Sequence, residues 1–296
     1  MYFYLKWKDR RPETIELLND RPKEINFSEI FKVKGEKYII CGWINPELYT
    51  YYPPVKITHK KSQYLSSHLQ KCIRRMDDIK SIKTAKNFID HDYTSFIRRL
   101  PIIMLEDVSL HESFPILIWL MISNSKGFKL RLPMFKWLLG VVYHLAKCRE
   151  KTFYSKTKGE MEIDTKNDIL MNTLRFRKHY GGMKGDMEMI EYYTQHLKDL
   201  SINNDKVHII KHTIEGLNKD EWLIEANDFH CNKYILDHLK GIFPKYKKEY
   251  LIKLIWIFSS SLNYRINQLE HTQKESDDWD VIKKEVRRYQ KKCIYY

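Results

Sequence analysis

The sequence predicts a mainly α-helical protein, a multi-helix array with a small β-containing region at its N-terminus. Two observations support this. Apolar residues recur every three or four positions from residue 61 onward, whereas aromatic and β-branched residues cluster before it. Hydrophobic residues make up 43% of the 296, against only 10 glycines and 9 prolines. This composition excludes a disordered or low-complexity chain and suffices for one large domain or two ordinary ones.

Residues 1–60 are the expected small mixed α/β region. The run Lys37–Ile44 is rich in β-forming residues and follows Gly35, which predicts a strand. Asn45-Pro46 is a turn signal, and Pro53-Pro54 blocks a helix there.

Residues 61–150 form an expected helical domain, because the apolar spacing changes to that of a helix at Lys61. A break is expected at His91-Asp92 and a kink or a second break at Pro101, while Pro133 is expected to open a later helix. The expected helices are a first one with Leu65, Leu69, Cys72 and Met76 inward, then 78–89, one from Thr94, 114–122, and 133–148.

The polar, lysine-rich residues 151–167 are an expected loop or linker, and 168–296 an expected helical C-terminal domain. Its predicted helices span 168–180, 186–200, 221–239 in two pieces, 246–268 and 277–293. The last helix has Ser276 as its expected N-cap. A narrow apolar stripe on it fits a core or a partner helix; it consists of Trp279, Ile282, Val286, Tyr289 and Cys293.

The chain is strongly basic, with 52 Lys+Arg against 38 Asp+Glu and a formal net charge of +14. A positive surface attracts polyanions, so nucleic acid is an expected partner. Only 14 of the basic residues are arginine, and the abundance of Lys, Ile, Asn and Tyr is typical of A+T-rich coding, as in a protist or a large DNA virus. The sequence does not separate selected charge from coding bias, so the arginine-containing pairs are the more informative part of the charge.

Basic residues recur as neighbours along the chain and predict a surface that holds phosphates. The pairs are Lys60-Lys61, Arg74-Arg75, Arg98-Arg99, Lys247-Lys248, Lys283-Lys284, Arg287-Arg288 and Lys291-Lys292. The predicted nucleic-acid or anion-binding residues are Arg74, Arg75, Arg98, Arg99, Arg175, Arg177, Lys178 and Lys184. Lys184 lies in the glycine-rich run 181–186, which is also the pattern of a helix C-cap followed by a tight turn.

Catalysis is the alternative, and no catalytic residue is assigned outright. Glu106-Asp107 follow an apolar stretch and could act as a general base or bind a metal, or could form a charged network with Arg98 or Arg99. With Asp186, Asp228 and His230 they would make a carboxylate–histidine site for a phosphorylated or nucleic-acid substrate. A third hypothesis is a helical interaction scaffold that binds a protein partner or itself.

No metal or cofactor is expected. His208 and His212 would share a helix face with Glu215, but the intervening residues do not form a zinc motif. The five cysteines are widely spaced and include no Cys-x-x-Cys, a pattern typical of free thiols in a reducing compartment. No apolar run reaches membrane-spanning length, and the N-terminus has no signal-peptide pattern. We therefore expect an intracellular protein of the cytoplasm or nucleus, without a membrane partner.

One segment resembles a known family. The segment 98–110 begins with Arg98-Arg99-Leu100 and continues, after five residues, with Glu106-Asp107-Val108 and then Leu110. This pattern resembles the helical collar-like region of clamp-loader-related, replication-associated recombination ATPases. Tyr143–Ala146 is similar to a later segment of that family, so the resemblance covers about residues 61–149. Ser109 departs from the family's glycine. The resemblance does not include the AAA+ module, so ATP binding and hydrolysis are not carried over. It implies a collar-like scaffold for assembly or docking in DNA replication or repair.

Overall fold

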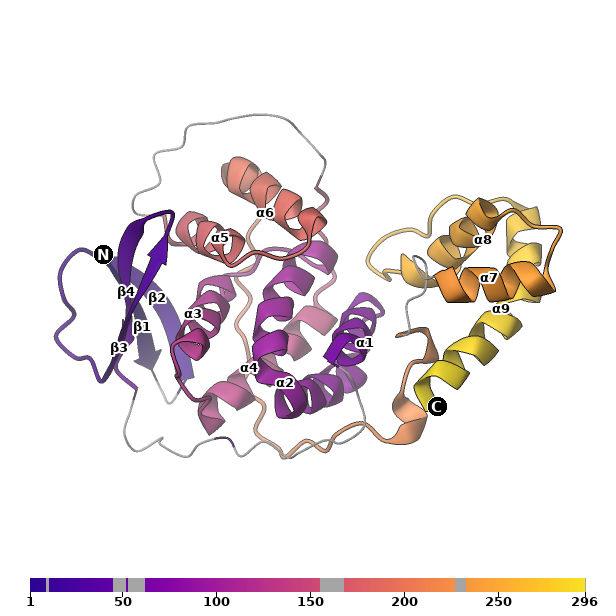
Figure 1. The fold of residues 1–296 in the computed structure, drawn as a ribbon. Helices are drawn as coiled ribbons and strands as arrows, with labels where there is room; N and C mark the ends of the chain where they lie inside the picture. The colour runs from indigo at the N-terminus through magenta and orange to yellow at the C-terminus, as the bar shows by residue number, and fades with distance from the viewer. Residues whose placement is uncertain (9–10, 45–51, 53–61, 155–167, 227–232, 296) are drawn as a thin grey trace.

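A small sheet lies against a group of helices, and a second group of three helices follows at the C-terminal end (Figure 1). The computed structural model describes residues 1–8, 11–44, 52, 62–154, 168–226 and 233–295. The fold is mainly α with a small N-terminal sheet, as predicted. Within the described residues, the helices are too short or too polar to cross a membrane.

The sheet has four strands in the order β2-β1-β4-β3. The strands are β1 (Tyr2–Lys8), β2 (Arg11–Leu18), β3 (Phe27–Val33) and β4 (Glu36–Gly42). β1 and β2 form one antiparallel hairpin and β3 and β4 another, while β1 and β4 pair in parallel at the centre. The strand expected over 37–44 corresponds to β4.

Aromatic contacts join the sheet to the helices. Phe176 of α5 (Ile169–His179) meets Phe3 and Phe31 edge to face, with ring centroids 5.4 and 5.2 Å apart. Trp119 of α3 (Phe114–Ser125) is fully buried, and its Nε1 donates a hydrogen bond to the Cys41 carbonyl of β4 at 3.0 Å. Edge-to-face rings and a satisfied indole N–H are the favourable way to bury these side chains.

α1 (Ser62–Arg74) packs against the long α2 (Asp78–Asp107). Asp92 interrupts α2 with φ −156° and ψ 82°, so the break expected at positions 91–92 is confirmed. Its Oδ1 accepts a hydrogen bond from the Ser95 amide at 2.9 Å, which starts the second half of the helix as an N-cap would.

Pro101 does not interrupt α2, so the helix break that was one of the two expectations there is absent, and Asp92 is the interior residue that departs from helical geometry. A proline removes one backbone hydrogen bond and crowds the preceding turn. The carbonyl of Arg98 in that turn accepts a hydrogen bond from Nη2 of Arg177 at 3.1 Å. This arginine is 3% exposed and attaches α5 to the turn of α2 that precedes the proline.

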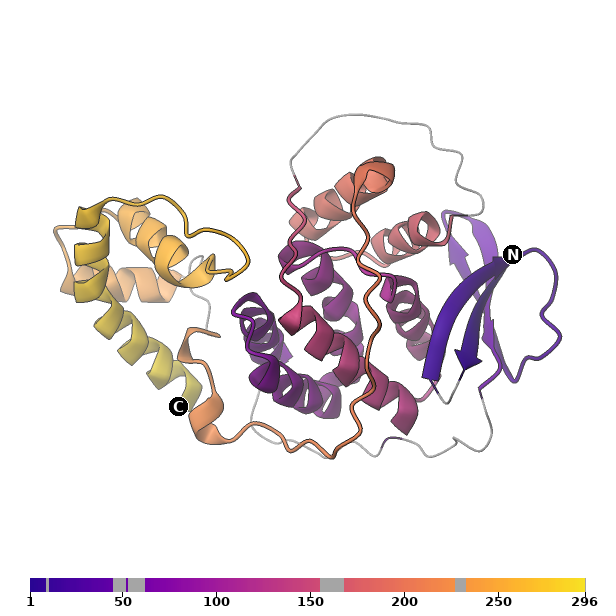
Figure 2. The ribbon, with the colours of Figure 1, turned by 180° about the vertical axis from the view of Figure 1, so that it is seen from behind.

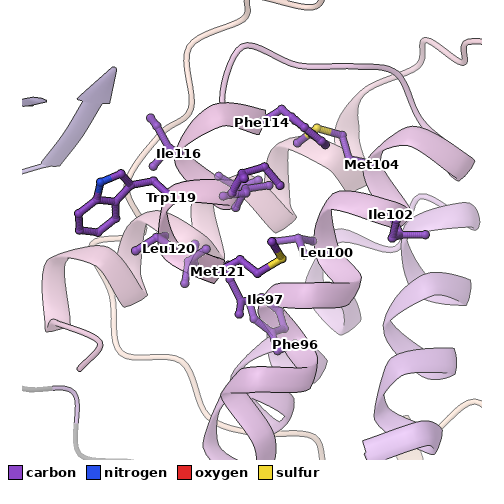
Figure 3. Packing of buried hydrophobic residues seen from close by; sticks show 14 of the residues in the cluster. Phe96, Ile97, Leu100, Ile102, Met104, Phe114, Ile116, Trp119, Leu120 and Met121 are labelled. Atoms are coloured by element: carbon purple, nitrogen blue, oxygen red, sulfur yellow. The ribbon is translucent and has the colours of Figure 1, made fainter. Parts of the chain in front are cut away.

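The main core lies where α2, α3 and α4 (Leu132–Lys147) meet. Figure 3 shows side chains of α2 and α3 packed together, among them Leu100, Met104 and Met121. Pro133 stands in the first turn of α4, where its missing N–H costs nothing, and this expected helix start is confirmed.

Two hydrophobic clusters can be distinguished among the described residues. α5 and α6 (Lys184–His196) pack on the main core through Met171, Leu174 and Ile190, and the division into domains at 151–167 stays a prediction. The second cluster begins at Ile235. The apolar faces of α5 and α6 cover the helices and sheet that precede them, which periodicity alone does not reveal.

Beyond α6 the chain runs across α4 in extended form (Figure 2). A Cβ atom at Gly140 would lie only 2.0 Å from the His208 carbonyl oxygen, so glycine is required for this close approach. Further along, the Leu223 backbone is held by α1. The Tyr64 hydroxyl donates to its carbonyl, and Nε2 of His68 accepts from its amide, both at 2.8 Å.

The second cluster is a three-helix unit of α7 (Lys233–Ile242), α8 (Lys248–Ile255) and α9 (Gln273–Tyr295). α8 continues into a π-helical turn, Trp256–Ser260. Ile282 and Val286 of α9 are buried in this cluster and Trp279 and Tyr289 pack against it, so this part of the predicted apolar stripe lies in the chain's own core, while Cys293 is exposed.

α9 begins earlier than expected, and its cap is Thr272 rather than Ser276. The Glu275 amide donates to Oγ1 of Thr272 at 3.2 Å, and the Thr272 amide donates to Oε2 of Glu275 at 2.8 Å. These reciprocal bonds are a capping box, which satisfies two amides that a helix start leaves unpaired.

Candidate functional site

A charged cluster joins the ends of α1 and α2. Arg74, the last residue of α1, donates to Oε1 of Glu106 at 2.7 Å and also to Asp107 through Nε. Arg99, two turns earlier on α2, donates to Oε2 of Glu106 at 3.2 Å and to Oδ2 of Asp186 at 3.3 Å. Two arginines thus form ion pairs with three carboxylates from α2 and α6.

Burial controls the electrostatics of this cluster. The pKa of Glu106 is raised by burial and by the neighbouring Asp107 carboxylate, while Arg74 and Arg99 lower it. Both acids stand in the last turn of α2, where the helix dipole already favours cations. The arginine contacts therefore compensate two unfavourable features at once.

The same helix ends hold the segment that follows the π-helix. The guanidinium of Arg265 donates to the carbonyl oxygens of Ile73 in α1 and Leu145 in α4, at 2.8 and 2.5 Å. Nδ2 of Asn263 donates to the Asp107 carbonyl at 3.0 Å, and Arg74 donates to the Ser260 carbonyl at 2.8 Å. Polar contacts to helix carboxyl ends thus attach the three-helix unit to the main core.

A pocket of about 460 Å³ lies at this attachment, and we call it the junction pocket. Its lining is mostly apolar, with a few charged groups, as is common for ligand sites between packed units. The π-helical turn forms part of the wall, and such turns are frequent at functional sites. The lining includes Arg74, Glu106, Asp107, Lys151, Tyr154, Trp256, Tyr264, Asn267 and Gln268.

Lys151 is a cation of the junction pocket, and it belongs to the segment 151–167 that was predicted to be a loop or linker. Its Nζ donates to the Glu106 carbonyl at 2.6 Å, and burial lowers the pKa of its ammonium. Burial likewise raises the pKa of the Tyr154 hydroxyl. These residues and the aromatic Trp256 and Tyr264 were not singled out as site residues. The sequence signal that could have indicated this site is the occurrence of aromatic residues among polar ones at 256–268.

The structure places most of the predicted anion-binding residues in contacts within the chain. Besides Arg74 and Arg99, these contacts are Arg75 with Glu225, Arg98 with the Tyr180 carbonyl, Arg177 with the Gly181 carbonyl, Lys178 with Glu191, and Lys184 with Glu188. Lys184 is nevertheless highly exposed, and Arg175 is exposed on α5. That these residues bind phosphate stays a prediction.

The candidate catalytic residues are only partly brought together. Glu106 and Asp107 share the charged cluster, and Asp186 reaches it through Arg99. Asp228 and His230 lie outside the described residues. Because Arg74 and Arg99 bind the carboxylates, the arrangement matches the charged network that was the alternative to a general base.

A second candidate surface lies on α9. Lys284, Arg287, Arg288, Lys291 and Lys292 are exposed there, and we call them the α9 basic face. Ile282, Val286 and Gln290 are buried on the other side of the helix.

No group of three or more metal-ligating side chains within the described ranges could hold a metal ion. His208 and His212 lie outside any helix, so the helix face that they were expected to share with Glu215 does not form. The chain matched no protein-family model, no curated protein and no solved structure in comparisons with each.

Proposed function

We propose that this protein is a non-catalytic nucleic-acid-associated factor that holds phosphates through the α9 basic face. One observation carries the proposal: three basic pairs, 283–284, 287–288 and 291–292, follow one another at four-residue intervals on α9, and five of these six residues are exposed. Residues four apart are neighbours on a helix surface, so the pairs form two adjacent rows about 12 Å long. Such rows can contact several successive phosphates.

The charge of this face is available to a ligand. Among the described residues, no ion pair is formed by Lys284, Lys291 or Lys292. Arg287 pairs with Glu225 at 3.2 Å and Arg288 with Glu285 at 3.5 Å, and both arginine side chains are more than half exposed. Glu225 also pairs with Arg75, and Glu285 is also hydrogen-bonded to His238, so each carboxylate keeps a second partner when a phosphate binds the exposed arginine.

The predicted arginines near the main core have a different part in this proposal. Arg74, Arg99 and Arg177 hold the fold together, because each donates to carboxylates or carbonyls inside it. The resemblance of residues 61–149 to a helical collar supports a setting in DNA replication or repair, with the main core as the scaffold and α9 as the contact to nucleic acid.

Salt-dependent binding tests the proposal. Anisotropy of a labelled single-stranded oligonucleotide would be measured with the full chain between about 50 and about 300 mM salt, where phosphate contacts make affinity fall steeply. Replacing Lys284, Lys291 and Lys292 by Gln should weaken binding and lower the slope of log affinity against log salt by about 2. The matched control replaces Lys32, Lys34 and Lys37 of the β3–β4 hairpin, which removes the same charge at a distant exposed site.

Two results would overturn the proposal. One is an affinity that does not change over this salt range. The other is an equal loss in the control variant, which would attribute binding to the total charge rather than to α9.

A further inference from the structure

We infer that the junction pocket takes up one unpaired nucleobase of a strand whose phosphates lie on the α9 basic face. The inference rests on the proposed function and adds a second contact of different chemistry. It would make the protein prefer single strands over duplexes, because paired bases cannot enter a pocket.

The charge of the pocket argues for an uncharged occupant. Two cations, Arg74 and Lys151, stand beside two carboxylates, Glu106 and Asp107, so the fixed charges of these four groups cancel. The remaining lining is mostly apolar, with side-chain amides such as Asn267. A phosphate would gain little here, whereas a planar base needs apolar walls together with donors and acceptors at its edges.

Aromatic side chains are exposed where such a base would enter. Tyr264 is 62% exposed, Trp256 43% and Tyr154 41%, and all three line the pocket. Bases stack on aromatic rings whatever their sequence, since every base has a π-face. The backbone supports this position, because the Tyr264 amide donates to the Arg74 carbonyl at 2.9 Å while its ring stays exposed.

The pocket lies next to the α9 basic face. Tyr264 also lines a neighbouring cavity of about 210 Å³, and Arg287 of α9 lines the same cavity. Tyr264 therefore stands between the junction pocket and one of the cations of that face. A strand bound along α9 can thus turn one base towards Tyr264 without leaving the surface.

An abasic strand separates base uptake from phosphate binding. Anisotropy would compare labelled oligothymidylate with a strand of equal length whose sugars carry no bases. The wild-type chain should bind oligothymidylate about fivefold more tightly or better, as one stacked base allows. Tyr264→Ala should remove this ratio and leave the affinity for the abasic strand unchanged. Tyr264→Phe should keep the ratio, and so should Tyr234→Ala, the matched control at an exposed tyrosine of α7.

The outcomes distinguish this inference from the proposed function. Equal wild-type affinity for both strands would overturn base uptake and leave phosphate binding by α9 intact. A ratio that survives Tyr264→Ala would place the base elsewhere and also overturn the inference. Absence of binding to either strand would overturn the proposed function itself.

Discussion

Arg74 and Glu106 face each other across the ends of α1 and α2, with Nη2 of the arginine 2.7 Å from Oε1 of the glutamate. Their side chains are 14% and 27% exposed, so the pair is mostly removed from water. Arg74 also donates to the Ser260 carbonyl of the π-helical turn. One side chain therefore connects two helices of the main core with the three-helix unit.

We expect Arg74→Met to lower the free energy of unfolding by about 2–4 kcal/mol, because it leaves the buried Asp107 without its ion-pair partner and Glu106 with Arg99 alone. Urea unfolding at neutral pH would measure the loss. Lys6→Met is the control, since Lys6 and Glu16 form an exposed pair worth at most about 1 kcal/mol. Equal losses in the two variants would contradict a special role for Arg74.

Local signals predicted much of the fold. The break at Asp92, the start of α4 at Pro133 and the end of α5 before Gly181 follow from side chains that act within a few residues. Gly181 has a φ of +71°, which suits glycine. The packing of α5 and α6 on the main core was missed, because it depends on contacts between faces that lie far apart in the sequence.

The charged cluster was anticipated in part. The spacing of Arg98-Arg99 and Glu106-Asp107 pointed to a network, and Arg99 does contact Glu106. Arg74 was expected to bind phosphate and instead contacts both acids, because α1 ends beside the end of α2. The junction pocket could not be predicted, since its walls come from segments separated by more than 100 residues.

We predict that Gly140→Ala lowers the free energy of unfolding by about 1–3 kcal/mol, the usual cost of overpacking. The new Cβ would meet the carbonyl oxygen of His208, a backbone atom that cannot move aside without shifting its segment. Gly241→Ala is the matched control in α7, where a Cβ meets no atom within 4 Å and the better helix propensity of alanine should raise stability. Thermal or urea unfolding of both variants tests this, and a loss in Gly241→Ala alone would contradict it.

Stability should fall in mild acid because of His68. This fully buried ring receives the Leu223 amide at Nε2, so it must stay neutral. Burial, with Lys80 and Arg75 nearby, lowers its pKa from 6.5 to about 3. As the pH falls, the unfolded state binds the proton before the folded state does. The stability that neutral His68 contributes is therefore complete above pH 6.5 and is lost progressively as the pH falls towards 3.

Between about pH 7 and about pH 4.5, His68 alone should cost about 2–3 kcal/mol of unfolding free energy. Urea unfolding across this range should give a flatter profile for His68→Gln than for the wild type, even if the variant is less stable at pH 7. His179→Gln, at an exposed position of α5, serves as the control. Parallel profiles for wild type and His68→Gln would contradict the assignment.

The capping box at the start of α9 yields the last prediction. Oγ1 of Thr272 accepts from the Glu275 amide, whereas Ser276 already lies inside the helix. Thr272→Ala should therefore lower the free energy of unfolding by about 1 kcal/mol, as loss of an N-cap does. Ser276→Ala should change it by less than about 0.5 kcal/mol, because alanine favours the helix interior. Urea unfolding of both single variants measures the difference, and a larger loss in Ser276→Ala would show that Ser276 is the cap, as first expected.

The same two variants also test whether fraying of the first turn of α9 affects binding. Both should keep the wild-type dependence of affinity on salt, because the α9 basic face lies more than two turns away from Thr272.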